Sequence, residues 1–387
     1  MSVARFLGWG GLVRLCLANM AIGGLAALPV NLFNRLMTVE LALPALLPGL
    51  LVALHYGVQL SRPVWGHRSD ARGGRTPFVI GGAGVVGLGL ILVAVGIQTA
   101  ETSTTAALLL WVIAYMAIGF GIGASGTSFL ALLAEAAPDA RKGAAATVAW
   151  LMLIAGAIVA SIGTGIALDP YSPQRLIVVV SVVALACTAL SAIATIGIER
   201  RLTRRADAPA AAPSLRVALR GTWADPAARA FTGFVFLSIL AFYLSELVLE
   251  PFMGHVHGLT PDDSTKMSGG KDGAALLGMI AAGALSTFGI GTLRGWAVTG
   301  CVVSAAGLVA LGAGGPLMAG VITLGVGNGL FVVGAIGSMM RLAAEREEAT
   351  GTRMGVFGAA QAIAAGLAGL IATGTLDVAR LAMPDAA

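Results

Sequence analysis

The chain has 387 residues, of which only 11% are charged and 57% are hydrophobic, and its mean hydropathy is +0.89. Soluble domains carry roughly 25% charged residues, so the composition excludes a water-soluble globular protein. Apolar runs recur along nearly the whole chain, and many have the length of about 20 residues that crosses a hydrocarbon layer roughly 30 Å thick. The composition therefore indicates an integral membrane protein with many spanning helices.

Hydropathy predicts eleven spanning helices in chain order. They cover residues 11–34, 46–65, 77–98, 106–134, 143–168, 174–197, 229–253, 272–292, 294–314, 316–341 and 353–375. The long polar break at 199–228 separates an N-terminal half of six helices (1–198) from a C-terminal half of five (229–387). Because this break is rich in arginine, alanine and proline, we interpret it as a flexible cytoplasmic linker.

An internal repeat indicates that the two halves are related. The segment Glu135-Ala-Ala-Pro-Asp-Ala-Arg-Lys-Gly143 parallels Glu347-Glu-Ala-Thr-Gly-Thr-Arg-Met-Gly355, and each leads into a helix rich in glycine and alanine. In the first half another span follows this helix, but few residues follow it in the second half. The twelfth helix of a six-plus-six arrangement is therefore expected to be missing.

The basic residues indicate the orientation. If the N-terminus is cytoplasmic, nearly all lysines and arginines fall in cytoplasmic loops, and the exceptions are Arg35, Arg175, Lys266, Lys271 and Arg380. The positive-inside rule therefore predicts a cytoplasmic N-terminus. The net charge of +5 then belongs to the cytoplasmic rim, and no nucleic-acid partner is needed to explain it.

A polar string occupies the predicted cytoplasmic loop between the second and third spans. It reads Gly66-His-Arg-Ser-Asp70-Ala-Arg72-Gly73-Gly74-Arg75. The glycines permit a tight turn, and Asp70 can pair with arginines and cap a helix N-terminus. This predicts a latch to the last predicted helix, and the alternative is a merely positive loop. The string resembles the signature loop of the major facilitator superfamily, which implies an all-α membrane fold of two six-helix halves.

Polar side chains inside the predicted spans are candidates for function. Glu246 and Glu250 share one helix face, and acids at membrane depth are usually functional. One interpretation is that they bind a proton or a ligand. The alternative is a role in packing or gating. His55 is the only histidine in a predicted span, and Gln59 lies one turn away. The imidazole could be an axial ligand to a metal macrocycle, or it could hydrogen-bond between helices.

The last predicted helix has a small-residue face formed by Gly351, Gly355 and Gly358, followed by Gln361 as a possible ligand-binding side chain. Close helix packing is expected along this face. The sequence contains no phosphate loop, no nucleophile constellation and no zinc spacing, so no enzyme activity and no catalytic residue are predicted.

Several segments carry a more specific resemblance. They are residues 34–45, 48–59, 62–66, 249–254 and 351–362. These segments resemble the PucC/LhaA family, the bacteriochlorophyll-delivery branch of the major facilitator superfamily in phototrophic bacteria. The resemblance implies a light-harvesting complex assembly factor in the bacterial inner, intracytoplasmic photosynthetic membrane.

The implied cargo or bound pigment is bacteriochlorophyll, and His55 would supply an axial nitrogen to its Mg²⁺. The implied partners are membrane lipids, antenna polypeptides, the reaction centre and bacteriochlorophyll-synthesis enzymes. Two alternatives stay open. One is a proton-coupled transporter of a small amphiphile with Glu246 as the proton carrier, and the other is a structural subunit docked beside an antenna or reaction-centre complex.

Overall fold

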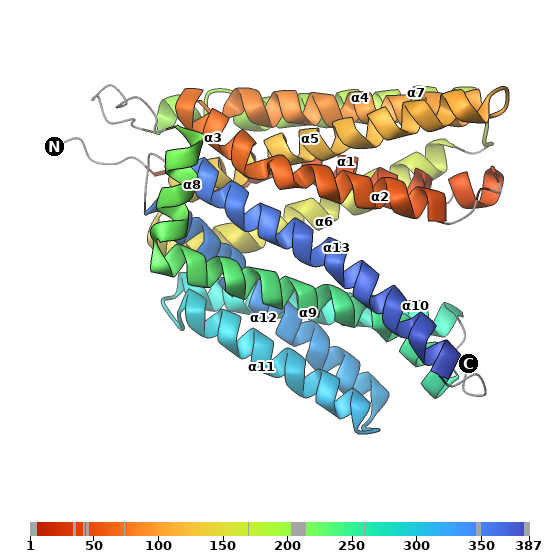
Figure 1. Ribbon diagram of the computed structural model, residues 1–387. Coiled ribbons are helices and arrows are strands. Elements are labelled where there is room, and N and C mark those ends of the chain that lie inside the picture. Colours follow the sequence, from red (N-terminus) through yellow and green to blue (C-terminus); the bar gives the residue numbers. More distant parts are fainter. Residues whose placement is uncertain are drawn as a thin grey trace. The chain divides into compact units, whose positions relative to one another are not determined.

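The computed structural model describes residues 6–33, 36–41, 43, 46–72, 74–168, 170–202, 214–258, 261–345 and 350–382. The regular structure of these residues is helical throughout (Figure 1). Within the same residues, eight helices are long and apolar enough to cross a membrane. The chain is therefore a multi-pass membrane protein.

The helices follow the spans predicted from hydropathy. In chain order they are α1 (Trp9–Leu28), α2 (Leu46–Val58), α3 (Arg62–Arg72), α4 (Thr76–Ala100), α5 (Thr104–Ala136), α6 (Lys142–Ala167), α7 (Pro173–Thr195), α8 (Leu215–Ala224), α9 (Pro226–His257), α10 (Pro261–Thr287), α11 (Leu293–Gly312), α12 (Leu317–Ala344) and α13 (Thr350–Ala382). Short helical turns lie between some of them, namely η1 (Pro29–Phe33), η2 (Leu36–Glu40), η3 (Gln59–Ser61), η4 (Asp139–Arg141) and η5 (Glu199–Arg201). The second predicted span is shared by α2, η3 and α3.

Two differences from the predicted elements have a clear physical origin. Helix α10 begins at Pro261, well before the predicted start at 272, because its first turns are polar and hydropathy detects only the apolar remainder. Helix α8 lies inside the segment predicted to be a flexible linker. It is a short amphipathic helix that buries Ala218 and Thr222 and exposes Val217, and such a helix is too short and too polar to register as a span.

Hydroxyl side chains fix the starts of three spanning helices. Ser103 Oγ accepts a hydrogen bond from the Ala106 N–H at the start of α5, at 3.3 Å. Ser172 caps α7 in the same way, and Thr292 caps α11. These oxygens satisfy N–H groups that have no partner within the helix, so the sequence sets these boundaries locally.

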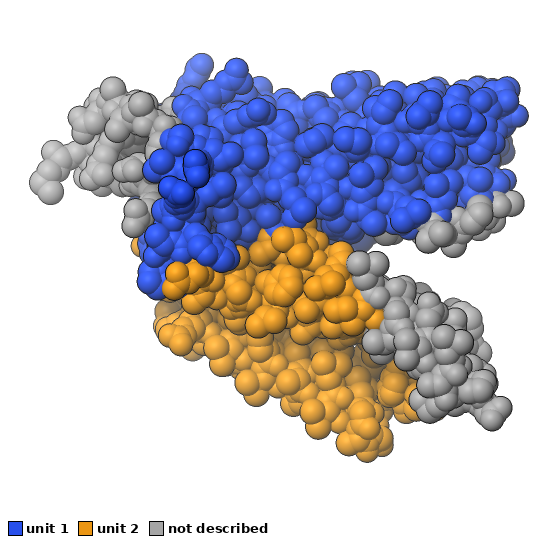
Figure 2. Space-filling model, viewed as in Figure 1, with its two compact units in different colours: residues 1–138, 148–228, 342–359 blue, residues 139–147, 229–341, 360–387 orange. Residues whose placement is uncertain are grey.

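The chain forms two compact units, which Figure 2 shows in different colours. Unit 1 comprises residues 1–138, 148–228 and 342–359, and unit 2 comprises residues 139–147, 229–341 and 360–387. Each unit takes in most of one predicted half. The first turns of α6 belong to unit 2, and the end of α12 with the start of α13 belongs to unit 1.

Unit 1 is held together by glycines that let helices approach closely. Gly82, Gly89 and Gly96 recur every seven residues along α4, and a side chain at any of them would collide with α5. Trp111 of α5 is fully buried beside Gly96, and its Nε1 donates to the Val93 carbonyl at 3.3 Å. In Figure 1, α4, α5 and α7 accordingly run side by side. Packing of this kind is typical of membrane helices.

Unit 2 repeats the same device. Gly320, Gly327 and Gly334 recur every seven residues along α12, and each faces α11 so closely that a side chain would collide with it. Ser304 of α11 also donates a hydrogen bond to Asn328 Oδ1 of α12, at 2.9 Å. The two units therefore share one packing scheme, as expected of related halves.

Candidate functional site

A polar stripe runs along α2, η3 and α3. His55, Gln59, Arg62, Gly66 and Asp70 follow one another at intervals of three or four residues, which places them on one helical face. His55 and Gln59 are buried. Four of the five are residues that the sequence singled out, and the structure aligns them on this face.

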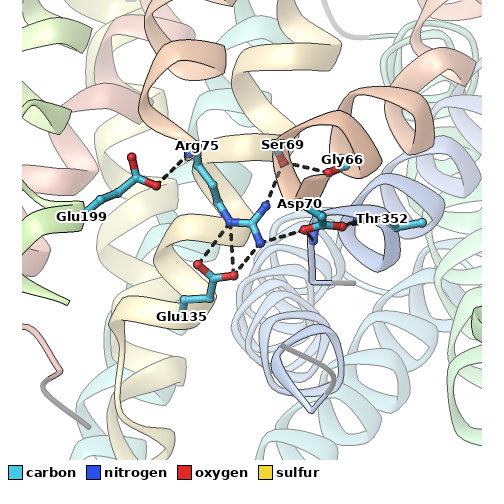
Figure 3. Close-up of polar contacts among 8 residues, drawn as sticks. Gly66, Ser69, Asp70, Arg75, Glu135, Glu199 and Thr352 are labelled. Atoms are coloured by element: carbon cyan, nitrogen blue, oxygen red, sulfur yellow. Dashed lines mark hydrogen bonds and ion pairs between the residues drawn. The ribbon is translucent and has the colours of Figure 1, made fainter. Parts of the chain in front are cut away.

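Asp70 caps the N-terminus of α13 (Figure 3). Its Oδ1 accepts from the Gly351 N–H at 2.8 Å, and its Oδ2 accepts from the N–H and the hydroxyl of Thr352 at 2.8 and 2.9 Å. The first N–H groups of a helix lack partners within it and carry partial positive charge. A carboxylate from a different helix satisfies them here.

Arg75 joins this cap to α5. Its guanidinium donates to Asp70 Oδ1 at 2.8 Å, to Glu135 Oε1 at 2.5 Å and to Ser69 Oγ at 2.8 Å (Figure 3). The Arg75 side chain is 5% exposed. Burial alone would lower the pKa of Arg75, but the carboxylates of Glu135 and Asp70 outweigh it and raise this pKa above its ordinary value. Arg75 therefore stays charged.

Glu199 of η5 caps α4. Its carboxylate accepts from the Arg75 N–H at 2.7 Å and from the Thr76 N–H at 3.1 Å. Because Arg75 uses its backbone for Glu199 and its side chain for Asp70 and Glu135, one residue connects the start of α4 to α3, α5 and η5. We call Ser69, Asp70, Arg75, Glu135 and Glu199 the Arg75 cluster.

A second carboxylate–arginine pair lies at the start of α9. Asp225 Oδ1 accepts from the Ala227 and Ala228 N–H groups at 3.0 and 3.4 Å, and Asp225 Oδ2 pairs with Arg353 of α13. Arg353, whose side chain is 1% exposed, also donates to the Leu342 carbonyl at 2.6 Å. Burial alone would raise the pKa of Asp225. The hydrogen bonds from Arg353 and from the two backbone N–H groups outweigh burial and lower this pKa below its ordinary value.

The glycines of α13 lie against α3. A side chain at Gly351 would collide with the Gly66 carbonyl and the Asp70 carboxylate, and one at Gly355 would collide with the backbone of Arg62. Gly358 lies against the Arg62 side chain. The absence of side chains at these positions lets the α13 N-terminus approach Asp70 within hydrogen-bonding distance.

Other residues of the predicted latch take no part in the hydrogen bonds described above for the Arg75 cluster. Arg72 is exposed and is not a partner of Asp70, and a Cβ added at Gly74 would lie 3.9 Å from Glu199 Oε2. Gly73 lies outside the described residues.

The other candidate side chains lie elsewhere in the chain. Gln361 is half-buried on α13. The side chains of Glu246 and Glu250 also lie outside the described part of the structure.

Several residues of this site have no role predicted from the sequence. They are Ser69, Glu135, Glu199, Asp225 and Arg353. Glu135 and Arg353 stand in the internal repeat, which could have drawn attention to them. Asp225 precedes a proline at the first position of α9, a recognisable helix start. Glu199 carries no such signal, because its partners lie more than a hundred residues earlier in the chain.

His55 belongs to a hydrogen-bonded chain with Gln59 and Arg62. Arg62 Nη2 donates to Gln59 Oε1, and Gln59 Nε2 lies 2.8 Å from His55 Nε2. The Gln59 oxygen accepts the hydrogen bond from Arg62, so the Gln59 amide nitrogen is the group that faces His55. This nitrogen can only donate, so His55 Nε2 accepts the hydrogen bond. The proton of a neutral imidazole therefore resides on Nδ1. His55 Nδ1 is buried and has no hydrogen-bond partner among the described residues.

The described residues contain no group of three or more histidine, cysteine, aspartate or glutamate side chains placed to hold a metal ion. In the Arg75 cluster each carboxylate is paired or caps a helix. The arrangement is suited to fixing helix ends.

Comparison with known families places the chain in one of them. The family model described as "PUCC protein" matches residues 32–387. The chain belongs to the PUCC protein family. Among similar members, a Rhodobacter capsulatus protein named "Bacteriochlorophyll synthase 44.5 kDa chain" is 51% identical over 98% of this chain and 90% of its own length. "Protein PucC" of Cereibacter sphaeroides is 30% identical over 97% of this chain and 84% of its own length. The resemblance predicted from sequence is confirmed.

Solved structures are similar in fold. A bacterial homologue of the iron transporter ferroportin, in its outward-facing state, has a TM-score of 0.74 at 14% identity and covers 97% of this chain and 93% of its own. The major facilitator proton:xylose symporter XylE has a TM-score of 0.66 at 15% identity, covering 96% and 90%. The predicted major-facilitator-like fold is therefore confirmed for this PUCC family member.

Proposed function

We propose that this PUCC family member is a non-catalytic assembly factor for light-harvesting antenna complexes, which holds bacteriochlorophyll as cargo and delivers it to antenna polypeptides. The observation that carries the proposal is the family match along nearly the whole chain, joined by 51% identity to a protein named for bacteriochlorophyll synthesis. The proposed location is the photosynthetic inner membrane, with a cytoplasmic N-terminus as the basic residues favour. Besides membrane lipids, the reaction centre and bacteriochlorophyll-synthesis enzymes are further candidate partners.

The chemistry of the cargo suits such a protein. Bacteriochlorophyll is a flat apolar ring with a long hydrocarbon tail, and its Mg²⁺ accepts one axial ligand. An apolar helical protein offers the surroundings that this cargo needs, and His55 offers a buried imidazole.

His55 can bind Mg²⁺ only through a nitrogen lone pair. The lone pair of Nε2 accepts a hydrogen bond from Gln59 in this structure. Ligation through Nε2 therefore requires Gln59 to turn away, which makes Gln59 a competitor for the same nitrogen. In this proposal Gln59 holds the imidazole in place while no pigment is bound.

The Arg75 cluster has a different role in the proposal. Its charges are already paired, so it does no chemistry on the pigment. It fixes the starts of α4 and α13, and Gly355 and Gly358 of α13 lie against the stripe that carries His55. Loss of the cluster is expected to disturb the helices around His55 without removing any pigment ligand.

The test is deletion of the gene in a phototrophic bacterium, followed by complementation. Near-infrared absorbance of the membranes measures antenna and reaction-centre bands separately, and chromatography measures free bacteriochlorophyll and its precursors. We expect the antenna bands to fall while pigment synthesis and the reaction centre persist. Accumulation of a precursor with loss of both complexes would instead indicate an enzyme of pigment synthesis. A proton-coupled transporter would show uptake into vesicles that depends on a pH gradient and is lost in Glu246→Gln.

A further inference from the structure

A second face of α3 carries basic and aromatic side chains. Trp65, Arg68 and Arg72 follow one another at helical spacing on a face different from that of Asp70. Together with His67 and Ala71 of α3 and Phe78 of α4, they line an open cavity of about 500 Å³. We call this cavity the Arg68 groove.

The Arg68 groove is suited to an anion. Its lining contains two arginines and a histidine but no acidic residue. The Arg68 guanidinium lies over the Trp65 ring at 5.1 Å from its centroid, which holds it at the edge of the groove. Both arginines are exposed, and within the described residues neither pairs with a carboxylate. The groove therefore presents two cations, and arginine forks match phosphate oxygens well.

An apolar stripe leads away from the groove. Trp65 packs edge-on against Phe120 of α5, with ring centroids 6.2 Å apart. Phe120, Met116, Ile113 and Leu109 continue along α5 at helical spacing and are all exposed. Because α5 is long and apolar enough to span a membrane, this exposed stripe is suited to contact a hydrocarbon chain. A polar groove at the end of such a stripe, bordered by tryptophan, is the arrangement found at a membrane interface.

We propose that the Arg68 groove binds the headgroup phosphate of an anionic phospholipid, with one acyl chain lying along the exposed stripe of α5. The two arginines contact the phosphate, and the stripe selects an amphiphile over a free anion. Basic pockets beside spanning helices are known to bind anionic headgroups. This proposal does not depend on the pigment cargo.

The test uses the purified protein in mild detergent with phosphatidylglycerol as the probe and phosphatidylcholine as the neutral comparison, with bound lipid counted by native mass spectrometry. We expect the double variant Arg68→Gln/Arg72→Gln to bind phosphatidylglycerol at least tenfold more weakly. The matched control is Arg216→Gln/Arg220→Gln, which removes two exposed arginines of α8 and is expected to bind as the wild type does. Circular dichroism verifies that both variants keep their helices.

Two further measurements separate the sources of the anion. Inorganic phosphate at millimolar concentration should leave bound phosphatidylglycerol in place, and a dihexanoyl form of the lipid should bind more weakly than the long-chain form. Ile113→Ala should reduce binding of the long-chain form alone. Displacement by phosphate, equal losses in the α3 and α8 variants, or unchanged binding in the α3 variant would overturn the proposal.

Discussion

The carboxylate of Asp70 binds both the N–H and the hydroxyl of Thr352, which lies 282 residues later in the chain. The same carboxylate pairs with Arg75 at 2.8 Å. One side chain therefore joins α3, the start of α4 and the start of α13, and removing it leaves both Arg75 and the α13 N–H groups with fewer partners.

Replacement of Asp70 by alanine tests this relationship. Breaking a buried charge pair costs about 3 to 5 kcal/mol, so Asp70→Ala should lower the thermal unfolding midpoint clearly and reduce antenna assembly while membrane insertion persists. Glu101→Ala is the control, because Glu101 is exposed at the end of α4 and a surface charge contributes little. Equal midpoints for the two variants, or normal antenna levels in Asp70→Ala, would contradict the role assigned to Asp70.

Close approach between α3 and α13 gives a second prediction. A methyl group at Gly66 would collide with the Gly351 backbone, whereas one at Gly57 of α2 would meet nothing within 4 Å. Gly66→Ala should therefore destabilise the protein by roughly 1 to 3 kcal/mol through overpacking. Gly57→Ala should be neutral or stabilising by up to about 1 kcal/mol, because alanine is the better helix former. Unfolding in denaturant compares the two, and a reversed order would refute the contact.

The Asp225–Arg353 pair predicts a dependence of stability on pH. Because the folded state lowers the pKa of Asp225 below its ordinary value of 3.8, the pair contributes its full stability above that value and loses it as the pH falls below it. Asp225→Asn keeps a cap for α9 but removes the titrating group. As the pH falls below about 4, the ordinary carboxylate range, and through the lowered pKa of Asp225, the unfolding midpoint of the wild type should therefore fall more steeply than that of the variant.

If the unfolding midpoints of the two proteins fall in parallel with pH, the pKa of Asp225 is not lowered in the folded state. The comparison is internal, because the two proteins differ only at residue 225.

Variants of His55 and of its hydrogen-bond partner Gln59 can show whether His55 is a pigment ligand or a packing residue. If His55 ligates Mg²⁺, His55→Leu should lose most bound bacteriochlorophyll, whereas Gln59→Leu should keep it or bind more, because Nε2 is freed. If His55 serves only packing and its hydrogen bond to Gln59, both variants should lose stability by about 0.6 to 2 kcal/mol and their pigment content should change alike. His55→Asn restores a hydrogen bond but ligates Mg²⁺ poorly, so recovery of pigment in that variant would contradict ligation. Pigment per purified protein is the measurement.

Hydropathy located the long helices because most carry a long apolar run, and among the described residues eight are long and apolar enough to cross a membrane. It missed α8, whose ten residues form an amphipathic helix with two arginines and no such run. The sequence shows that α4 and α12 are rich in glycine. It does not show which neighbouring helix each glycine faces, because that depends on how helices distant in the chain pack together.

The site was predictable only in part for the same reason. Asp70 stands in a recognisable string, and the glycines of α13 form a visible pattern. Asp70 pairs with Arg75 and not with Arg72 because the two arginine side chains point in different directions, and a sequence pattern does not give these directions. Glu199 reaches the start of α4 only because α7 packs against α4, and no local signal in the sequence specifies that pairing.

Transfer of bacteriochlorophyll to antenna polypeptides is the activity that the proposed function requires. The protein is purified, loaded with bacteriochlorophyll and mixed with antenna polypeptides in mild detergent, and the red-shifted antenna band is followed with time. If the protein delivers pigment, the band should grow as pigment leaves the protein, faster than from the same amount of free pigment. Equal rates from loaded protein and from free bacteriochlorophyll would contradict such delivery.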